Sequence, residues 1–219
     1  MYQYCGPGSQ EVADRFPINN YFWHQLIAQK GYIVICTDGR GTGYRGETFK
    51  KKTYLQLGKY ESEDQIAVAK NIGQMPFVDK NRIGIWGWSY GGFMSSTCIF
   101  KGNDVFKMAV AVAPVTNWRY YDNIYTERYM RKPIENTKGY DENAPEHMVD
   151  KLKGKFLLIH GTADDNVHMQ NAIMMMDAMI KANKEYDSEF YPNKNHGISG
   201  GNTRLHLFNR ITNFITANL

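Results

Sequence analysis

A serine set between glycines follows a short apolar run. The segment RIGIWGWSYGGF, residues 82–93, contains the pattern G-x-S-x-G with Ser89 at its centre. In this pattern a sharp turn from strand to helix exposes the central hydroxyl, and Gly87 and Gly91 let the strand and helix approach closely. Chance also produces such pentapeptides, and the serine is then an ordinary turn residue. The context of an apolar run before it and a helical spacing after it favours a nucleophile.

A serine hydroxyl needs a base to take its proton, and a histidine base needs an acid to fix its tautomer. For G-x-S-x-G the expected chain order is serine, acid, histidine. The segment LLIHGTADDNVH places Asp164 and Asp165 after one apolar run, and EFYPNKNHGISGG places His196 after the next. Spacing leaves either aspartate as the acid. Catalytic groups collect at the carboxyl ends of strands in open α/β sheets, so we expect the three residue types to meet there.

The other histidines fit the base less well. His196 alone combines a loop after a predicted strand with a flanking glycine. We expect His160, at the end of an apolar run, to serve packing or to make a backbone hydrogen bond. The remaining histidines are expected to serve packing or the surface: His24, His147, His168 and His206.

Short apolar runs alternate with helical patterns along the chain. Strands are predicted at residues 1–5, 32–37, 83–86, 108–112, 156–160 and 189–191. Helices are predicted at 21–29, 61–72 and 169–182, and their apolar faces hold Phe22, Leu26 and Ile27, then Ile66, Ala69 and Ile72, then Ile173, Met176 and Ile180. This alternation predicts an α/β fold in a single domain over residues 1–219, with a mostly parallel sheet covered by helices on both faces. Residues 118–146 lack strand character and are predicted to lie over one face.

Composition excludes several other classes of protein. The chain has 219 residues, of which 42% are hydrophobic and 22% charged, and its net charge of +4 is scattered, which argues against a nucleic-acid partner. No apolar run is long enough to span a bilayer. Cys5, Cys36 and Cys98 have no C-x-x-C spacing, so we expect neither a disulfide nor a metal site, and all three are predicted to be buried.

A second glycine pattern could indicate a different kind of binding site. Gly41, Gly43 and Gly46 spell G-x-G-x-x-G after the predicted strand at 32–37, which is the format of a dinucleotide-binding turn. No apolar helical stripe follows it, and the acid expected further on is absent. We therefore expect these glycines to shape a loop near the site, and no cofactor.

Several segments together resemble one family. GWSYGG, HGTADDNVH, NHGI, YYDNIYTERYM and DGRGTGY are similar to the catalytic domain of the dipeptidyl peptidase IV branch of the prolyl oligopeptidases, from Tyr4 to near the C-terminus. The resemblance implies an α/β-hydrolase fold and a serine peptidase that removes dipeptides with Pro or Ala in second position through an acyl-enzyme. It also implies that Ser89 is the nucleophile, Asp164 the acid and His196 the base.

The same resemblance implies further site residues. The backbone N–H of Tyr90 and the hydroxyl of Tyr4 would bind the oxyanion, although Tyr4 by itself would be an ordinary strand aromatic. The Tyr90 ring would also line the pocket for the residue before the cleaved bond. Alongside it, the implied substrate-binding residues are Val115, Trp118, Tyr121, Tyr125, Arg128, Asn166 and Val167.

The chain also departs from the family pattern. Family members carry an N-terminal β-propeller that binds the substrate amine, and no segment here corresponds to it. The first two strands of the hydrolase sheet are also expected to be missing. The resemblance implies a location outside the cytoplasm and a surface on which a homodimer can form. A carboxylesterase or acyl-peptide hydrolase of the same fold, or an inactive fragment, are the alternatives.

Overall fold

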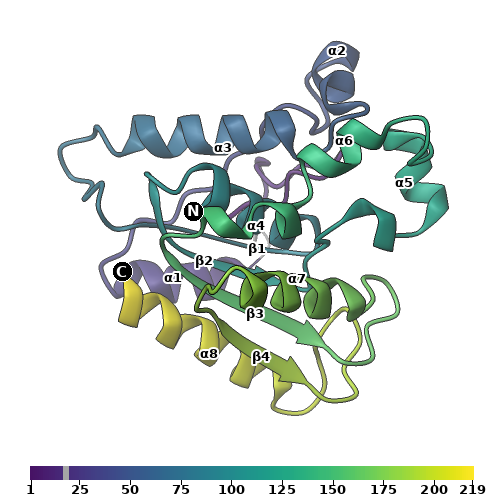
Figure 1. The fold of residues 1–219 in the computed structure, drawn as a ribbon. Helices are drawn as coiled ribbons and strands as arrows, with labels where there is room; N and C mark the ends of the chain where they lie inside the picture. Colours follow the sequence, from purple (N-terminus) through teal and green to yellow (C-terminus); the bar gives the residue numbers. More distant parts are fainter. Residues whose placement is uncertain (17–19) are drawn as a thin grey trace.

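A parallel sheet forms the centre of the computed structural model, which describes residues 1–16 and 20–219 (Figure 1). Its strands are β1 (Ile83–Trp88), β2 (Phe106–Val112), β3 (Lys155–Gly161) and β4 (Asp187–Tyr191), and they lie in that order. All three strand pairs are parallel, so the four carboxyl ends meet at one edge. The predicted α/β class is therefore confirmed.

The strands predicted at residues 1–5 and 32–37 are wrong as regular strands. In place of these strands the described residues have two isolated parallel bridges, one from Tyr2 to Trp86 of β1 and one from Tyr2 to Cys36. The backbone turns away soon after Tyr2, because Cys5 adopts a φ of +67°. The Gln3 side chain then donates hydrogen bonds to the Gly91 carbonyl and to Ser95 Oγ, each at 2.9 Å. The N-terminal segment is thus fixed beside β1 without a ladder.

Helices cover both faces of the sheet (Figure 1). α1 (Tyr21–Gln29) and α8 (Thr203–Asn218) lie on one face, and α3 (Lys59–Ile72), α4 (Tyr90–Lys101) and α7 (Gln170–Lys181) lie on the other. The remaining helices are short: α2 (Glu47–Lys50), η1 (Lys51–Thr53), η2 (Trp118–Tyr120), α5 (Asn123–Met130), α6 (Thr137–Glu142), η3 (Pro145–His147) and η4 (Val149–Lys151). The segment 118–146 is helical and loop-like, with no strand, as predicted. No helix in the described part of the chain has the length and apolar character needed to cross a membrane.

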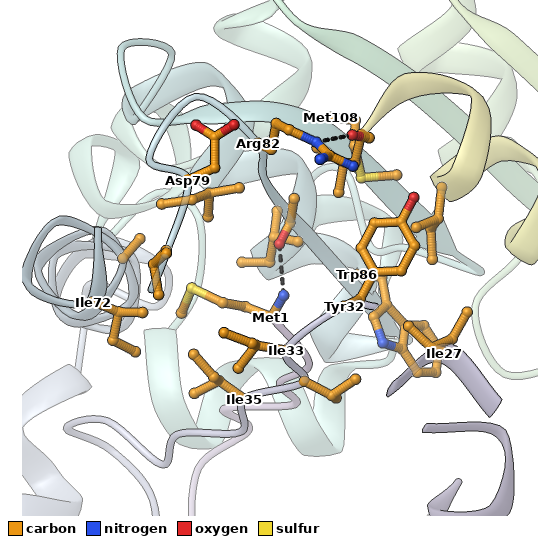
Figure 2. A pocket seen from close by; sticks show the side chains of 18 of the residues that line it. Met1, Ile27, Tyr32, Ile33, Ile35, Ile72, Asp79, Arg82, Trp86 and Met108 are labelled. Carbon is orange, nitrogen blue, oxygen red and sulfur yellow. Dashed lines mark hydrogen bonds between the residues drawn. The ribbon is translucent and has the colours of Figure 1, made fainter. Parts of the chain in front are cut away.

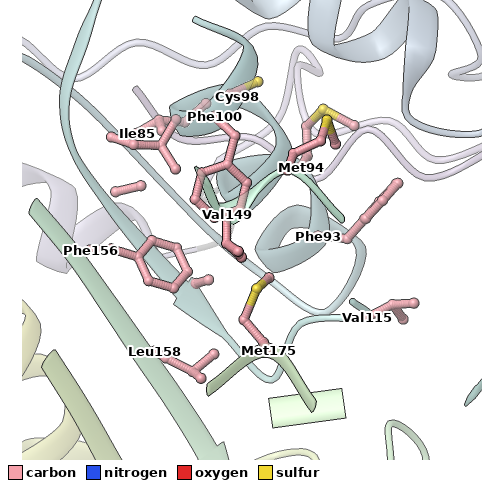
Figure 3. Close-up of a cluster of buried hydrophobic side chains, with 14 of the residues drawn as sticks. Ile85, Phe93, Met94, Cys98, Phe100, Val115, Val149, Phe156, Leu158 and Met175 are labelled. Carbon is pink, nitrogen blue, oxygen red and sulfur yellow. The ribbon is translucent and has the colours of Figure 1, made fainter. Parts of the chain in front are cut away.

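Alternating strand residues divide the core into two clusters. Ile85, Ala111 and Leu158 point into the α4 and α7 side, which also holds Phe93 and Phe100 and is shown in Figure 3. Trp86, Val112 and Ile159, each the next residue along, point to the α1 and α8 side. This period of two is what a strand with both faces covered produces. Burial on both faces fixes the register of the strands, and the strands in turn fix where the loops after β1, β3 and β4 begin.

The predicted apolar faces of two helices are wrong in part. On α7, Ile173 and Ile180 are 45% and 67% exposed, whereas the buried residues are Ala172, Met175 and Met179. On α1, Phe22 and Leu26 are exposed and Ile27 is buried together with His24. Two apolar stripes one residue apart satisfy the same helical period, and contact with the sheet selects between them. The predicted burial of the cysteines holds for Cys5 and Cys98, whereas Cys36 is only half-buried, and all three are free.

Candidate active site

Ser89 lies in the turn between β1 and α4. Its φ of +61° and ψ of −118° are strained for a residue with a side chain, and its N–H donates to the Val112 carbonyl of β2 at 2.8 Å. A Cβ on Gly87 would lie 2.6 Å from the backbone of Gly91, and one on Gly91 would lie 2.4 Å from the Gln3 carbonyl oxygen. Glycine is therefore required at both positions, as the sequence predicts.

The predicted acid and base are hydrogen-bonded to each other. Asp164 follows β3 and His196 follows β4, and His196 Nδ1 lies 2.8 Å from Asp164 Oδ2. Because a carboxylate accepts, Nδ1 carries the proton and Nε2 is left free to act as a base. Spacing left Asp164 and Asp165 as alternatives, and in the structure Asp164 is buried against the imidazole while Asp165 is exposed.

A side chain of the serine turn also bonds the loop that carries the base. Trp88, which precedes Ser89, donates from Nε1 to the His196 carbonyl at 3.0 Å. Among the hydrogen bonds of the described residues, none links the Ser89 hydroxyl to His196. Such contacts are often long in resting enzymes and tighten when substrate binds. The structure thus brings all three residues to the carboxyl edge of the sheet and forms one of the two bonds of a triad.

The surroundings of Asp164 keep it ionised. The backbone N–H groups of Asn166 and Val167 donate to Oδ1 at 3.0 and 2.9 Å. His160 Nε2 lies 2.7 Å from the Val167 carbonyl and 3.4 Å from Asp164 Oδ2, so the same imidazole supports both groups. Burial would raise the pKa of Asp164, but the hydrogen bonds from His160 and His196 outweigh it and hold the pKa well below its ordinary value. His160 was expected to bond a backbone group, and it does.

The predicted oxyanion donors lie beside Ser89. Tyr90 begins α4, so its backbone N–H is at the start of that helix. The side chain of Tyr4 lies beside that of Ser89, and this polar neighbour opposes the rise that burial causes in the pKa of Tyr4. The ring centroids of Tyr4 and Tyr90 are 6.0 Å apart. The loop holding Gly41 and Gly43 exchanges backbone hydrogen bonds with Gly8 and Ser9, which places it near the segment that carries Tyr4.

Aromatic rings from η2 and α5 pack beside the serine turn. The Trp118 ring stacks on Tyr125 with centroids 5.8 Å apart and lies 5.4 Å from Tyr90. Tyr121 meets Tyr125 edge-on at 5.3 Å. Val115 and Val167 are buried in the same core cluster. The aromatic and aliphatic residues of the predicted pocket therefore lie together as one apolar group.

The two predicted polar residues of the pocket occupy different positions. Asn166 is exposed, and its Oδ1 accepts a hydrogen bond from the Tyr121 hydroxyl at 2.6 Å. Arg128 is also exposed and lies over the Tyr129 ring, 6.0 Å from its centroid. Only Asn166 contacts one of the other predicted pocket residues among the interactions of the described residues.

Two residues near the site were missed by the sequence analysis. Glu61 accepts a hydrogen bond from the Tyr90 hydroxyl at 2.6 Å, and Trp88 holds the His196 loop as described above. Glu61 stands in a run of acids, KYESED, where its one distinguishing feature is its place three residues after the N-cap Gly58, and that feature concerns only the start of α3. No signal in the chain pairs it with Tyr90.

A separate cavity of about 260 Å³ lies away from these residues (Figure 2). Apolar side chains of Met1, Ile33, Ile35 and Ile72 line it, with Arg82 beside β1. It sits at the amino ends of the strands, opposite the edge that carries Ser89. Its position makes it no part of the candidate active site.

Comparisons with known proteins agree with this geometry. The model of the prolyl oligopeptidase family matches residues 19–219. A probable dipeptidyl-aminopeptidase B of Ajellomyces capsulatus is 44% identical over 98% of this chain and 24% of its own length. A protein of the same name from Arthroderma benhamiae is 48% identical over 89% of this chain and 22% of its own length. The crystal structure of Porphyromonas gingivalis dipeptidyl peptidase 4 matches 100% of this chain and 31% of its own chain, with 51% identity and a TM-score of 0.96. The chain thus spans about a quarter to a third of these relatives, and its fold is that of an α/β hydrolase.

Proposed function

Because this chain belongs to the prolyl oligopeptidase family, we propose that it carries the catalytic site of a serine peptidase that releases dipeptides from peptide N-termini. The observation that carries the proposal is the 2.8 Å hydrogen bond from His196 to Asp164 at the same sheet edge as the strained Ser89. The names of the relatives support the choice of dipeptides as products.

The reaction follows from the protonation states. His196 Nε2 takes the proton of the Ser89 hydroxyl as its oxygen bonds to the substrate carbonyl carbon. The Tyr90 N–H and the Tyr4 hydroxyl stabilise the negative oxygen that forms. The imidazolium, held by Asp164, then gives its proton to the departing amine. A water molecule, deprotonated by the same imidazole, hydrolyses the acyl-enzyme and frees the serine.

The aromatic group suits a particular residue before the cleaved bond. A prolyl ring is compact and apolar and lacks an N–H, so the flat aromatic walls made by Tyr90, Trp118 and Tyr125 can enclose it without leaving a donor unpaired. An alanyl methyl fits the same space with less contact. We therefore propose Pro and then Ala in the second position of the substrate.

A fluorophosphonate probe tests the nucleophile directly. Wild type is expected to be labelled and Ser89→Ala is not, while the neighbouring Ser95→Ala variant, altered on the core side of α4, keeps its label. Equal labelling of wild type and Ser89→Ala would contradict the proposal.

Substrate panels test the reaction class. Hydrolysis of Gly-Pro and Gly-Ala amides by the full-length protein is the expected result. Hydrolysis of simple esters or acetylated peptides alone would favour a carboxylesterase or an acyl-peptide hydrolase of the same fold.

A further inference from the structure

A fully buried carboxylate lies directly behind the serine turn. Glu61 is on α3, which packs against α4, and its side chain has 0% exposure. Oε1 accepts a hydrogen bond from the Tyr90 hydroxyl at 2.6 Å, and Oε2 accepts one from the Gly58 N–H at 3.0 Å. The proton transfers derived above make no use of it.

The environment of Glu61 is costly for a charge. Lys101 is a cation whose charge acts on Glu61, but its Nζ bonds the Gly58 carbonyl at 3.3 Å and Asn143 Oδ1 at 3.0 Å. Among the ion pairs of the described residues, none includes Glu61. A glutamine or an apolar residue would avoid the desolvation penalty of the acid. Helix capping alone does not require a buried carboxylate, because an exposed acid can accept the same hydrogen bond from the N-cap N–H.

Tyr90 joins Glu61 to the chemistry in two ways. Its backbone N–H follows Ser89 and is the proposed oxyanion donor, and its ring is a wall of the proposed substrate pocket. Three rings touch its sides, with centroid distances of 5.3 Å to Phe93, 5.4 Å to Trp118 and 6.0 Å to Tyr4. Among the hydrogen bonds of residues 1–16 and 20–219, the Tyr90 side chain makes one, from its hydroxyl to Glu61.

We propose that Glu61 is a positioning residue of the active site, which fixes the Tyr90 ring through its hydroxyl and thereby holds the Tyr90 N–H toward the oxyanion. This inference rests on the proposed function. Glu61 touches neither substrate nor reacting atoms, so its effect must pass through Tyr90.

The same contact makes the site sensitive to pH. Burial raises the pKa of Glu61 to about 7, although the Tyr90 hydrogen bond opposes the rise. The titratable groups that face Glu61 come from three elements: Tyr90, Cys98 and Lys101 of α4, Cys5 of the N-terminal segment and Tyr125 of α5. The lysines close to it along the chain are exposed, namely Lys51 and Lys52 of η1 and Lys59 of α3. Burial raises the pKa of both thiols and both phenols further, so they stay neutral near pH 7. Protonation of Glu61 below that pH therefore weakens the charge-assisted bond to Tyr90.

A double-mutant cycle on the full-length protein tests this route. Glu61→Gln keeps the shape of the side chain and removes its charge, and Tyr90→Phe removes the hydroxyl but keeps the ring and the N–H. Each is expected to lower both the rate of fluorophosphonate labelling and kcat on Gly-Pro amides by about 10- to 100-fold at pH 8, with a smaller change in KM. The double variant is expected to lose no more than the stronger single variant.

Glu63→Gln is the matched control. It removes one acid from the same helix, where Glu63 is half exposed and bonds Arg40, and it should leave rates unchanged. Wild-type activity should also fall more steeply on the acid side of its pH profile than that of Glu61→Gln, because protonation of Glu61 contributes to the loss in the wild type and cannot in the variant. A purely structural role would lower the melting temperature without changing the shape of this profile.

The outcomes separate the two proposals. A wild type that is not labelled at Ser89 would overturn the proposed function and this inference together. A labelled wild type with unchanged rates and pH profile in Glu61→Gln would overturn only this inference, as would additive losses in the double variant. Should Glu61→Gln fail to fold, Tyr90→Phe alone must still slow labelling, and a wild-type rate in that variant would overturn the role of the hydroxyl.

Discussion

Asp164 and Glu61 are two buried carboxylates beside the same serine turn, yet their surroundings differ sharply. Asp164 receives hydrogen bonds from two backbone N–H groups and from His196, and His160 Nε2 lies 3.4 Å from it. The two histidines hold its pKa well below the ordinary value. Glu61 receives one backbone N–H and one phenol, and its pKa rises to about 7. Burial opposes ionisation at both sites, so the number and type of donors decide the outcome.

The difference in pKa suits Asp164 and Glu61 to different roles. An acid that must stabilise an imidazolium needs a permanent charge, and Asp164 has the donors to keep one. An acid that only holds a neighbouring side chain can tolerate a proton. Glu61 becomes protonated as the pH falls below its pKa of about 7. We therefore expect changes at Asp164 to be large and independent of pH above neutrality, and changes at Glu61 to be smaller and dependent on pH.

The largest effect is expected from Asp164→Asn. The amide keeps the size of the side chain but favours the wrong tautomer of His196, so kcat should fall by about 10⁴-fold with little change in the fold. Single-turnover hydrolysis of a Gly-Pro amide, with circular dichroism as a check of folding, measures this. Asp165→Asn is the matched control, because Asp165 is exposed one residue along the same loop. A loss of similar size in Asp165→Asn would reverse the assignment of the acid.

A smaller effect is expected from Tyr4→Phe, at the point where the two regions meet. The side chain of Tyr4 lies beside that of Ser89, and its ring lies next to that of Tyr90, whose hydroxyl bonds Glu61. Loss of one oxyanion donor should lower kcat by about 10²- to 10³-fold while leaving KM within a few-fold. Steady-state kinetics on Gly-Pro amide give both values. Tyr2→Phe, whose hydroxyl bonds Glu11 instead, should keep wild-type kcat, and an unchanged kcat in Tyr4→Phe would remove Tyr4 from the oxyanion site.

The contrast between the two carboxylates also marks what the sequence can predict. Asp164 was predictable as one of two adjacent aspartates, because chain order and the end of a strand limit where the acid of a G-x-S-x-G protein can lie. Glu61 was not, because its role depends on how α3 packs against α4, and such a contact leaves no local pattern. Spacing alone did not decide between the two aspartates and gave no role to Tyr4 or to the aromatic pocket. The resemblance to a known family supplied these assignments.

The fold shows the same division. Runs such as residues 108–112 are short and continuously apolar, which is typical of a strand buried on both faces, and the structure has β2 there. The apolar face of α7 was predicted one residue away from the true one, because Ile180 and Met179 satisfy the same helical period. At the N-terminus, residues 1–5 have strand composition but only bridge the sheet at Tyr2, since the positive φ of Cys5 ends the extended backbone. Tertiary contacts decide both cases.

The smallest effect is expected in the pH dependence of stability. In the native state Glu61 keeps its proton up to about pH 7, whereas in the unfolded chain it loses it near its ordinary pKa of 4.5. Between these values the native state binds more protons, so the contribution of Glu61 to the free energy of unfolding falls as pH rises, by at most about 1.4 kcal/mol per pH unit. Asp164 has the opposite sign, because its lowered pKa adds stability above its ordinary value of 3.8 and loses it only in stronger acid. Urea unfolding from pH 4.5 to 7 should therefore show Glu61→Gln gaining stability relative to wild type as pH rises, while Glu63→Gln runs parallel to wild type. Parallel curves for Glu61→Gln and wild type would mean that the buried carboxyl titrates like an exposed one, and the contrast with Asp164 would be lost.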